Sequence, residues 1–451
     1  MFGAVPQTGS YRTLAPHPAC GHLPPKGEGS KTGRLPSKGK AFAYDKKGVT
    51  QLNTEKVISR DNDYILHTYG RSQIVLAEGE GMTARDADGK SYLDFTSGIG
   101  VNSLGYCHPA WVRAVADQAA TLQHTSNLYY TAPDGKLAKK LCRRTGLDAV
   151  FFGNSGAEAN EGAIKTARRW GKEHANGAGG IITAIKSFHG RTLATLAATG
   201  QDSKQDPFAP LPTGFAHVPL NDIAALEEAI HTEIDGTKPV ALMLEPIQGE
   251  SGVWPCTREY LQAARRLTSE NNMLLIFDEV QTGFCRTGDY FAFQTFGVEP
   301  DIVSMAKGIA DGVPMGAFAA KEDIAAVMKP GMHGSTFGGS NLACAASDAT
   351  TQVMCEPGFL EHVREVGAYL REQLATLPFV VEVRGEGLMV GVSLDKPVAS
   401  ALVMAALEAG FVLNAPAADI LRFLPPLIIT KEDVDALMGA LPSCYEEACN
   451  D

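Results

Sequence analysis

The chain lacks any long hydrophobic run. No run approaches the roughly 18 apolar residues that a membrane-spanning helix needs, and charged residues recur throughout. Of its 451 residues, 44% are hydrophobic and 20% are charged, a globular profile with room for two or more domains. We therefore expect a soluble protein without a membrane partner.

Positive charge and paired cysteines are also scarce. The net charge of -11 disfavours nucleic acids and anionic membranes as partners. The nine cysteines are odd in number, scattered and never spaced CxxC, which argues against a disulfide framework and against a zinc site. We predict no metal site and a reducing, cytoplasmic location.

Residues 1–50 differ from the rest of the chain. They are rich in proline and glycine and show no apolar periodicity, so we predict a disordered extension. Their basic character would also suit an organellar transit segment, although the amphipathic Arg/Ser pattern of such segments is missing.

From about Thr54, short apolar runs alternate with helix-length periodic segments. The runs are AVFFGN, GIITAI, FAHVPL, PVALMLEP, MLLIFDEV and DIVSMAKG, and helical segments such as SGAEANEGAIKTARRW lie between them. This βαβ rhythm predicts an α/β fold with a mostly parallel sheet covered by helices on both faces. After about Leu342, a long helix and short strands around FVVEVRGEGLMVGVSL predict a separate, smaller domain.

Reactive residue types follow several of these predicted strands. They are Asn154-Ser155-Gly156-Ala157 after AVFFG, Glu245 after VALML, Asp278 after LLIF and Lys307 after DIVSMA. Because ligands of an open parallel sheet bind beyond the carboxyl ends of its strands, one crevice would hold all of them. Taken singly, the serine could be a helix cap, Glu245 could have a local partner, Asp278 could cap a following turn, and the lysine could be solvated.

Together these residue types meet the needs of pyridoxal 5'-phosphate. Its phosphate favours free N–H groups at a helix start, and its aldehyde needs a lysine for a Schiff base. Its pyridine nitrogen needs a carboxylate that keeps the ring protonated as an electron sink. Phe188, just after GIITAI, would cover the ring, although core packing would explain it equally. We expect His189 to be structural, because Lys307 is placed to move the proton.

Further motifs occur in order between about Thr68 and Thr430. They are TYGR, YLDFTSGIGVNSLGYCHP, HTSNLYY, FFGNSGAEANE, SFHGRTLATLAATG, EPIQGESG, FDEVQTGFCRTG, MAKGI, HGSTFGG and LRFLPPLIIT. On these motifs the chain resembles the class III, fold-type I aminotransferases, and HTSNLYY with TYGR favours their acetylornithine branch. The resemblance implies a large cofactor-binding domain, residues 108–342, and a smaller α+β domain from both chain ends, residues 51–107 and 343–451.

The resemblance also assigns the cofactor contacts. Lys307 would carry the Schiff base, Asp278 would pair with the pyridine nitrogen, and these two would be the catalytic residues. Thr336 would reach the phosphate of the neighbouring subunit's cofactor, which implies a homodimer with shared active sites. The full implied set of cofactor-binding residues is Ser155, Gly156, Ala157, Phe188, Asp278, Glu279, Val280, Gln281, Lys307 and Thr336.

Two arginines are candidates for binding substrate carboxylates, which a planar guanidinium reads bidentately. By resemblance, Arg191 would bind the substrate carboxylate, with Ser335 close by. Arg422 would meet the α-carboxylate of glutamate or 2-oxoglutarate. Glu250 would pair with Arg422 while the amine donor is bound and release it for the dicarboxylate. Without the resemblance, a surface salt bridge would be the favoured interpretation of each arginine.

The implied activity transfers the terminal amino group of N2-acetylornithine to 2-oxoglutarate, a step of arginine biosynthesis. The same scaffold serves ornithine, succinylornithine and 4-aminobutyrate aminotransferases, and these alternatives remain open. A dinucleotide-binding oxidoreductase would need a GxGxxG after a strand, which is absent. A non-catalytic relative would lack the lysine, which is present as Lys307 in MAKGI.

Two positions depart from the family pattern. Ser340-Asn341 stands where Asn-Pro is usual, and Tyr106 stands where histidine is common. Neither is a cofactor contact, so we expect them to affect substrate preference more than the chemistry.

Overall fold

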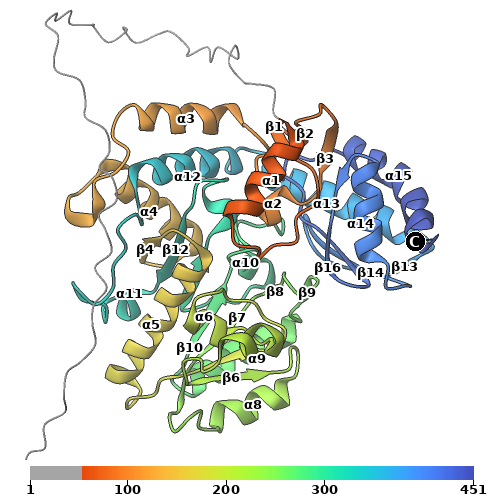
Figure 1. Cartoon of the computed structure of the whole chain (residues 1–451). Coiled ribbons are helices and arrows are strands. Elements are labelled where there is room, and N and C mark those ends of the chain that lie inside the picture. The colour runs from red at the N-terminus through yellow and green to blue at the C-terminus, as the bar shows by residue number, and fades with distance from the viewer. Residues whose placement is uncertain (1–52, 451) are drawn as a thin grey trace, which may run out of the picture. The chain divides into compact units, whose positions relative to one another are not determined.

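The computed structural model describes residues 53–450, whose largest sheet has seven strands (Figure 1). Its strand order is β4-β12-β11-β10-β7-β5-β6, and all neighbours are parallel except those of β12. Six of these strands are the six predicted runs, which confirms the α/β fold. The predicted extension, residues 1–50, lies outside the described residues. The strand bounds are β4 Ala149–Gly153, β5 Gly180–Ala184, β6 Phe215–Val218, β7 Pro239–Leu244, β10 Leu274–Asp278, β11 Ile302–Met305 and β12 Gly316–Ala320.

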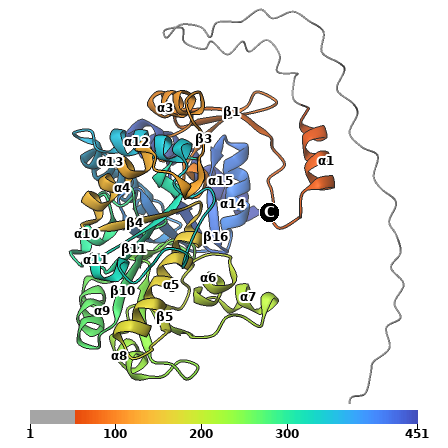
Figure 2. The same cartoon turned by 90° about the vertical axis from the view of Figure 1, so that its left-hand side faces the viewer.

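Side chains alternate between the two faces of the sheet along each strand, and in the central strands both faces are buried. In β10, Leu274 and Ile276 pack in the cluster that includes α5 (Gly156–His174), whereas Leu275 and Phe277 pack in the cluster that includes α9 (Arg258–Glu270). Figure 2 shows α5 and α9 on opposite sides of the strands. A doubly covered sheet needs strands that are apolar throughout, which is why the runs were recognisable in the sequence.

The sequence analysis did not predict β12. Its residues, GAFAA, are mostly alanine and glycine, which have low strand propensity. The small residues allow a close approach, since a Cβ atom on Gly316 would lie 2.1 Å from the carbonyl oxygen of Ser155. β12 therefore lies directly against the start of α5.

Two four-stranded sheets lie outside the central one. In the first, β15 pairs in parallel with β3, so strands from both ends of the described chain share one sheet. The second, β13-β14-β17-β16, is antiparallel and contains the predicted FVVEVRGEGLMVGVSL strands, with α14 and α15 beside it in Figure 1. The bounds are β1 Leu76–Glu80, β2 Thr83–Asp86, β3 Ser91–Asp94, β8 Ile247–Gln248, β9 Trp254–Pro255, β13 Val380–Glu386, β14 Met389–Leu394, β15 Phe411–Val412, β16 Asn414–Ala417 and β17 Ile420–Phe423.

The remaining helices connect and cover these sheets. No helix within residues 53–450 is long and apolar enough to cross a membrane. The bounds are α1 Thr54–Tyr64, α2 Ser97–Gly100, α3 Pro109–Ala119, α4 Ala132–Thr145, α6 Leu193–Ala198, α7 Asp202–Gln205, α8 Ile223–His231, α10 Ala292–Phe296, α11 Glu322–Ala325, α12 Asn341–Met354, α13 Phe359–Ala375, α14 Ala399–Glu408 and α15 Lys431–Asn450, with 3-10 turns at Ser126–Leu128, Asp206–Phe208 and Lys307–Ile309.

Candidate active site

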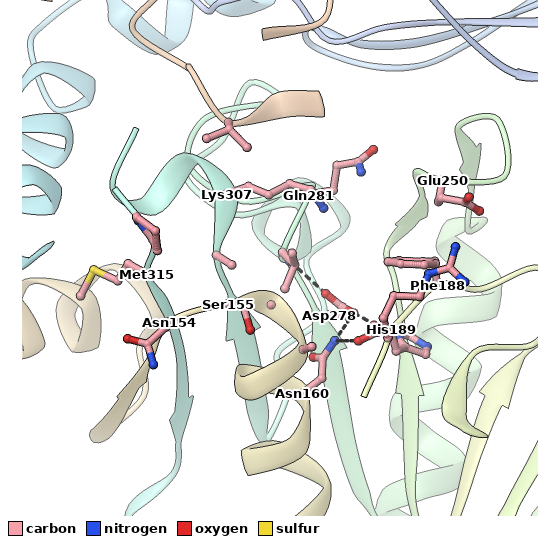
Figure 3. Close-up of a pocket in the computed structure, with 18 of the residues that line it drawn as sticks. Asn154, Ser155, Asn160, Phe188, His189, Glu250, Asp278, Gln281, Lys307 and Met315 are labelled. Carbon is pink, nitrogen blue, oxygen red and sulfur yellow. Dashed lines mark hydrogen bonds and ion pairs between the residues drawn. The ribbon is translucent and has the colours of Figure 1, made fainter. Parts of the chain in front are cut away.

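The carboxyl ends of β4, β10 and β11 open into a cavity of about 380 Å³ (Figure 3). This is the crevice expected for an open parallel sheet. The cavity brings together most of the predicted site residues, namely Ser155, Gly156, Ala157, Phe188, Arg191, Glu250, Asp278, Val280, Gln281 and Lys307. The predicted residues that do not line it are Glu279, Ser335, Thr336 and Arg422.

One wall of the cavity is the start of α5, where Ser155 caps the helix. Its Oγ accepts a hydrogen bond from the backbone nitrogen of Glu158 at 3.1 Å. Gly156 lies so close to Val280 that a Cβ atom there would be 2.7 Å from the valine Cγ1. The first N–H groups of a helix have no partner inside the helix and carry its positive dipole end. This wall therefore suits a phosphate group.

Lys307 lines the cavity directly after β11. Its φ of 49° lies in the left-handed region, where non-glycine residues are rare and often functional. Its Nζ forms no hydrogen bond or ion pair with any residue in the described range 53–450. Burial lowers the pKa of Lys307, and the opposing charge of Asp278 does not reverse this shift. Lys307 is therefore closer to the neutral amine that reacts with carbonyl groups or carries a proton.

Asp278 ends β10 with its carboxylate held by three donors. Its Oδ2 accepts from Asn160 Nδ2 at 2.7 Å and lies 2.8 Å from His189 Nδ1, and its Oδ1 accepts from the backbone nitrogen of Val280 at 3.0 Å. His189, expected to be structural, thus fixes this carboxylate. Asn160 was missed by the sequence analysis, although a polar residue on the buried face of α5 was a signal that could have identified it.

Glu245, at the end of β7, joins two loops of the site. Burial raises the pKa of Glu245 well above its ordinary value. Its oxygens accept from the backbone nitrogens of Phe188 at 2.9 Å and Gly249 at 3.1 Å. Arg191 is exposed at the cavity edge, with its Cζ 5.5 Å from the centre of the Phe188 ring. Glu245 therefore fixes the backbone that carries the Phe188 ring, and Arg191 places a cation beside that ring.

Glu250 and Arg422 are neighbours without being an ion pair. Arg422 donates from Nη1 to the carbonyl of Gly249 at 2.8 Å and from Nε to Asn414 Oδ1 at 3.0 Å. Glu250 instead pairs with Lys204, at 3.0 Å between Nζ and Oε1. Lys204, which the sequence analysis missed, is thus a further charged residue of the site. Its position in the four-residue helix α7 gave no signal that separates it from a surface lysine.

Glu279 does not occupy the predicted position. Its carboxylate accepts from the backbone nitrogens of Ala292 at 3.0 Å and Phe293 at 2.8 Å, at the start of α10. Burial raises the pKa of Glu279 to about 7. Consecutive residues of an extended segment point to opposite sides, so Asp278 faces the cavity while Glu279 faces away. Glu279 therefore stabilises α10 and is not placed to contact a cofactor.

Ser335 and Thr336 lie on the loop that precedes α12. Ser335 Oγ accepts from Asn154 Nδ2 at 3.1 Å, which places it beside a residue of the cavity wall. Thr336 is exposed and forms no hydrogen bond with another described residue. Thr336 therefore has no polar partner within residues 53–450.

Comparisons with known proteins agree with this geometry. Residues 64–444 match the family model described as aminotransferase class III. The chain belongs to this family. It is 50% identical to the acetylornithine aminotransferase of Methanocaldococcus jannaschii over 88% of this chain and 99% of that protein, and 48% identical to that of Caldanaerobacter subterraneus over 87% and 99%.

Solved structures give the same relationship. The ornithine aminotransferase of Toxoplasma gondii superposes with a TM-score of 0.83 at 32% identity, over 89% of this chain and 98% of that chain. The acetylornithine aminotransferase of Elizabethkingia anophelis superposes with a TM-score of 0.78 at 36% identity, over 88% and 99%. The fold is therefore that of the fold-type I enzymes, and the chain is an aminotransferase.

Class III aminotransferases depend on pyridoxal 5'-phosphate, and the cavity fits this group. The start of α5 suits its phosphate, Asp278 offers an oriented carboxylate, and Lys307 is an amine without a protein partner in residues 53–450. The buried amide oxygen of Gln281 also lacks a hydrogen-bond partner among the described residues. A bound group with polar substituents would satisfy it.

The two departures from the family pattern have structural roles. Ser340 caps α12, with its Oγ accepting from the backbone nitrogen of Ala343 at 3.4 Å. Tyr106 donates from its hydroxyl to Asp94 Oδ2 at 2.8 Å. Neither Ser340 nor Tyr106 lines the cavity. Their observed contacts are a helix cap and a hydrogen bond within the fold.

Proposed function

We propose that this enzyme transfers the terminal amino group of N2-acetylornithine to 2-oxoglutarate, giving N-acetylglutamate 5-semialdehyde and glutamate in arginine biosynthesis. The observation that carries the proposal is the pair Arg191 and Arg422, neither of which has a carboxylate partner within residues 53–450. Arg191 would bind the carboxylate of acetylornithine, and Arg422 the α-carboxylate of 2-oxoglutarate. The names of the relatives above support this choice of substrate.

The contacts of the residues that line the cavity support one role in the amino transfer for each of them. Pyridoxal 5'-phosphate, when bound, supplies an electron sink for the carbon that loses its proton. Lys307 would take that proton and return it at the end of the transfer, because burial favours its neutral form. Asp278, fixed by His189 and Asn160, would keep the ring nitrogen protonated. Ser155, Gly156 and Ala157 would hold the phosphate.

A panel of amine donors with 2-oxoglutarate tests the substrate. We expect kcat/KM for N2-acetylornithine to exceed the values for ornithine, N2-succinylornithine and 4-aminobutyrate by at least about tenfold. Coupled detection of glutamate measures all four donors on the same scale, with a reaction that lacks the donor as the control. A preference for one of the other donors would replace the proposed substrate with that donor.

We also propose a homodimer in which Thr336 of each subunit completes the other active site. Large apolar side chains are exposed beside Thr336, including Leu128 at 80%, Tyr129 at 71% and Phe337 at 63%. Asn127 connects their two segments by donating to the carbonyl oxygens of Ser335 and Gly338, both at 3.0 Å. Exposed apolar patches of this kind usually mark protein interfaces.

Mixing two inactive variants tests this sharing. Lys307→Ala removes the reactive amine, and Thr336→Asp places a negative charge where a phosphate should lie. Heterodimers would carry one site with both native residues, so reassociation of an equal mixture should restore about a quarter of wild-type activity. Heterodimers that are confirmed by mass measurement and remain inactive would show that Thr336 serves the site of its own subunit.

The location and the domain division are proposals as well. We propose a cytoplasmic enzyme, on the scattered cysteine pattern, with a large domain at residues 108–342 and a smaller domain from residues 51–107 and 343–451. The parallel pairing of β3 with β15 supports joining the two ends of the chain. Limited proteolysis would test the division by cutting first near these boundaries.

A further inference from the structure

The carboxylate of Glu250 is held by two side chains from the segment around α7. Lys204 Nζ lies 3.0 Å from Oε1 and 3.1 Å from Oε2, and Gln201 Nε2 donates to Oε2 at 3.0 Å. Gln201 Nε2 also donates to the carbonyl of Ser187 at 2.9 Å, and Lys204 donates to the Gln201 amide oxygen. Lys204 is thus oriented by its own neighbour, and its side chain is only 18% exposed.

A second cation, Arg422, lies close to the same carboxylate. Arg422 is 5% exposed and donates to the carbonyl of Gly249, the residue before Glu250. Burial lowers the pKa of Arg422, while the charge of Glu250 acts in the opposite direction. Burial alone would raise the pKa of Glu250, but the hydrogen bonds from Gln201 and Lys204 and the charges of Lys204 and Arg422 lower it. Glu250 is therefore an anion between two cations and contacts only one of them.

The position of this anion sets the charge that Arg422 offers to a ligand. With Glu250 on Lys204, the guanidinium charge of Arg422 has no contacting carboxylate among residues 53–450. If Glu250 lost Lys204, Arg422 would be the nearest remaining cation to neutralise it. A ligand carboxylate would then have to displace Glu250 before it could bind Arg422. Figure 3 places Glu250 on the same side of the cavity as Phe188.

We propose that Lys204 is a positioning residue that, with Gln201, holds Glu250 away from Arg422 and so favours dicarboxylate ligands over monocarboxylates. The proposal rests on the proposed function in assigning the second ligand carboxylate to Arg422. It adds a specific partner for Glu250, and it predicts that acceptor preference is set partly by α7, outside the cavity wall.

Lys204→Met tests the proposal, because methionine keeps much of the side-chain length and removes the charge. Calorimetric titration of the cofactor-loaded enzyme with glutarate, a dicarboxylate that cannot react, should show binding weakened by about tenfold, as expected for loss of one charge-assisted contact. Binding of butyrate should stay within about twofold, because it offers one carboxylate. KM for 2-oxoglutarate should rise with the glutarate Kd, while KM for the amine donor stays unchanged or falls.

Three further variants separate positioning from other roles of Lys204. Lys204→Arg should restore glutarate binding, and Lys186→Met should change neither ligand, because Lys186 is exposed and contacts the Trp254 ring instead. In a Glu250→Gln background, adding Lys204→Met should have no further effect, because no carboxylate remains to be held. Equal weakening in that background would overturn the proposal, since Lys204 would then bind the ligand directly.

Two other results would also overturn it. Unchanged binding of both glutarate and butyrate in Lys204→Met would mean that Glu250 stays in place without the lysine. An equal loss for both ligands would mean that Lys204 only stabilises the loop. A wild-type enzyme that does not use 2-oxoglutarate would contradict the proposed function instead, and the glutarate titration would still decide the role of Lys204.

Discussion

Replacing Lys307 with alanine is expected to abolish transamination and to leave the fold intact. The loss should exceed the factor of about 10² to 10⁴ that a positioned acid–base group contributes, because the same amine also has to react with the cofactor aldehyde. Stability should not fall. The pKa of Lys307 is lower in the folded than in the unfolded chain, so at neutral pH burying this amine in the cofactor-free protein costs folding free energy.

Three measurements check this result. The variant should lose the visible absorbance of the lysine-bound cofactor, and borohydride should fix the cofactor on the Lys307 peptide in the wild type only. In cofactor-free protein, its thermal midpoint should equal or exceed that of the wild type. Lys307→Arg is the matched control for charge, since it remains protonated and should be inactive as well. Turnover or visible absorbance retained in Lys307→Ala would show that another amine carries the chemistry.

The sequence was sufficient to predict the strands that are formed by large apolar residues, of which β7 and β10 are buried on both faces. The runs LLIF and VALML are apolar throughout because α5 and α9 cover opposite faces, and an uninterrupted apolar run is visible without coordinates. β12 was not predictable in the same way. Its Gly316 allows a close approach to Ser155, and small residues carry little information about strand formation.

Site residues were predictable where strand ends determine their position. Ser155 follows β4, Asp278 ends β10 and Lys307 follows β11. The topology of the sheet therefore brings them together at its edge. Side-chain direction was less predictable, as Glu279 shows by facing α10. The role of Lys204 was not predictable, because its partner Glu250 lies 46 positions away in the sequence and no regular pattern connects α7 to that loop.

Asp278→Asn is the second change with a large expected effect. The amide cannot carry the negative charge that would keep the ring nitrogen protonated, and loss of one oriented electrostatic partner of a reacting group typically costs about 10² to 10³ in kcat. The fold should survive with a free energy of unfolding lowered by about 1–3 kcal/mol. An amide presents one N–H side, which must face either the Val280 nitrogen or the donors from Asn160 and His189.

Glu279→Gln provides a closely matched control for this prediction. It makes the same acid-to-amide change at the next residue, which is also fully buried but faces the start of α10. We expect it to lower stability and to leave kcat within about twofold, because the side chain does not line the cavity. Denaturant unfolding and single-turnover kinetics of both variants separate the two effects. Normal kcat in Asp278→Asn would contradict the assignment of Asp278 to the ring nitrogen. An equal loss of kcat in Glu279→Gln would contradict it as well, since burial rather than side-chain direction would then determine the effect.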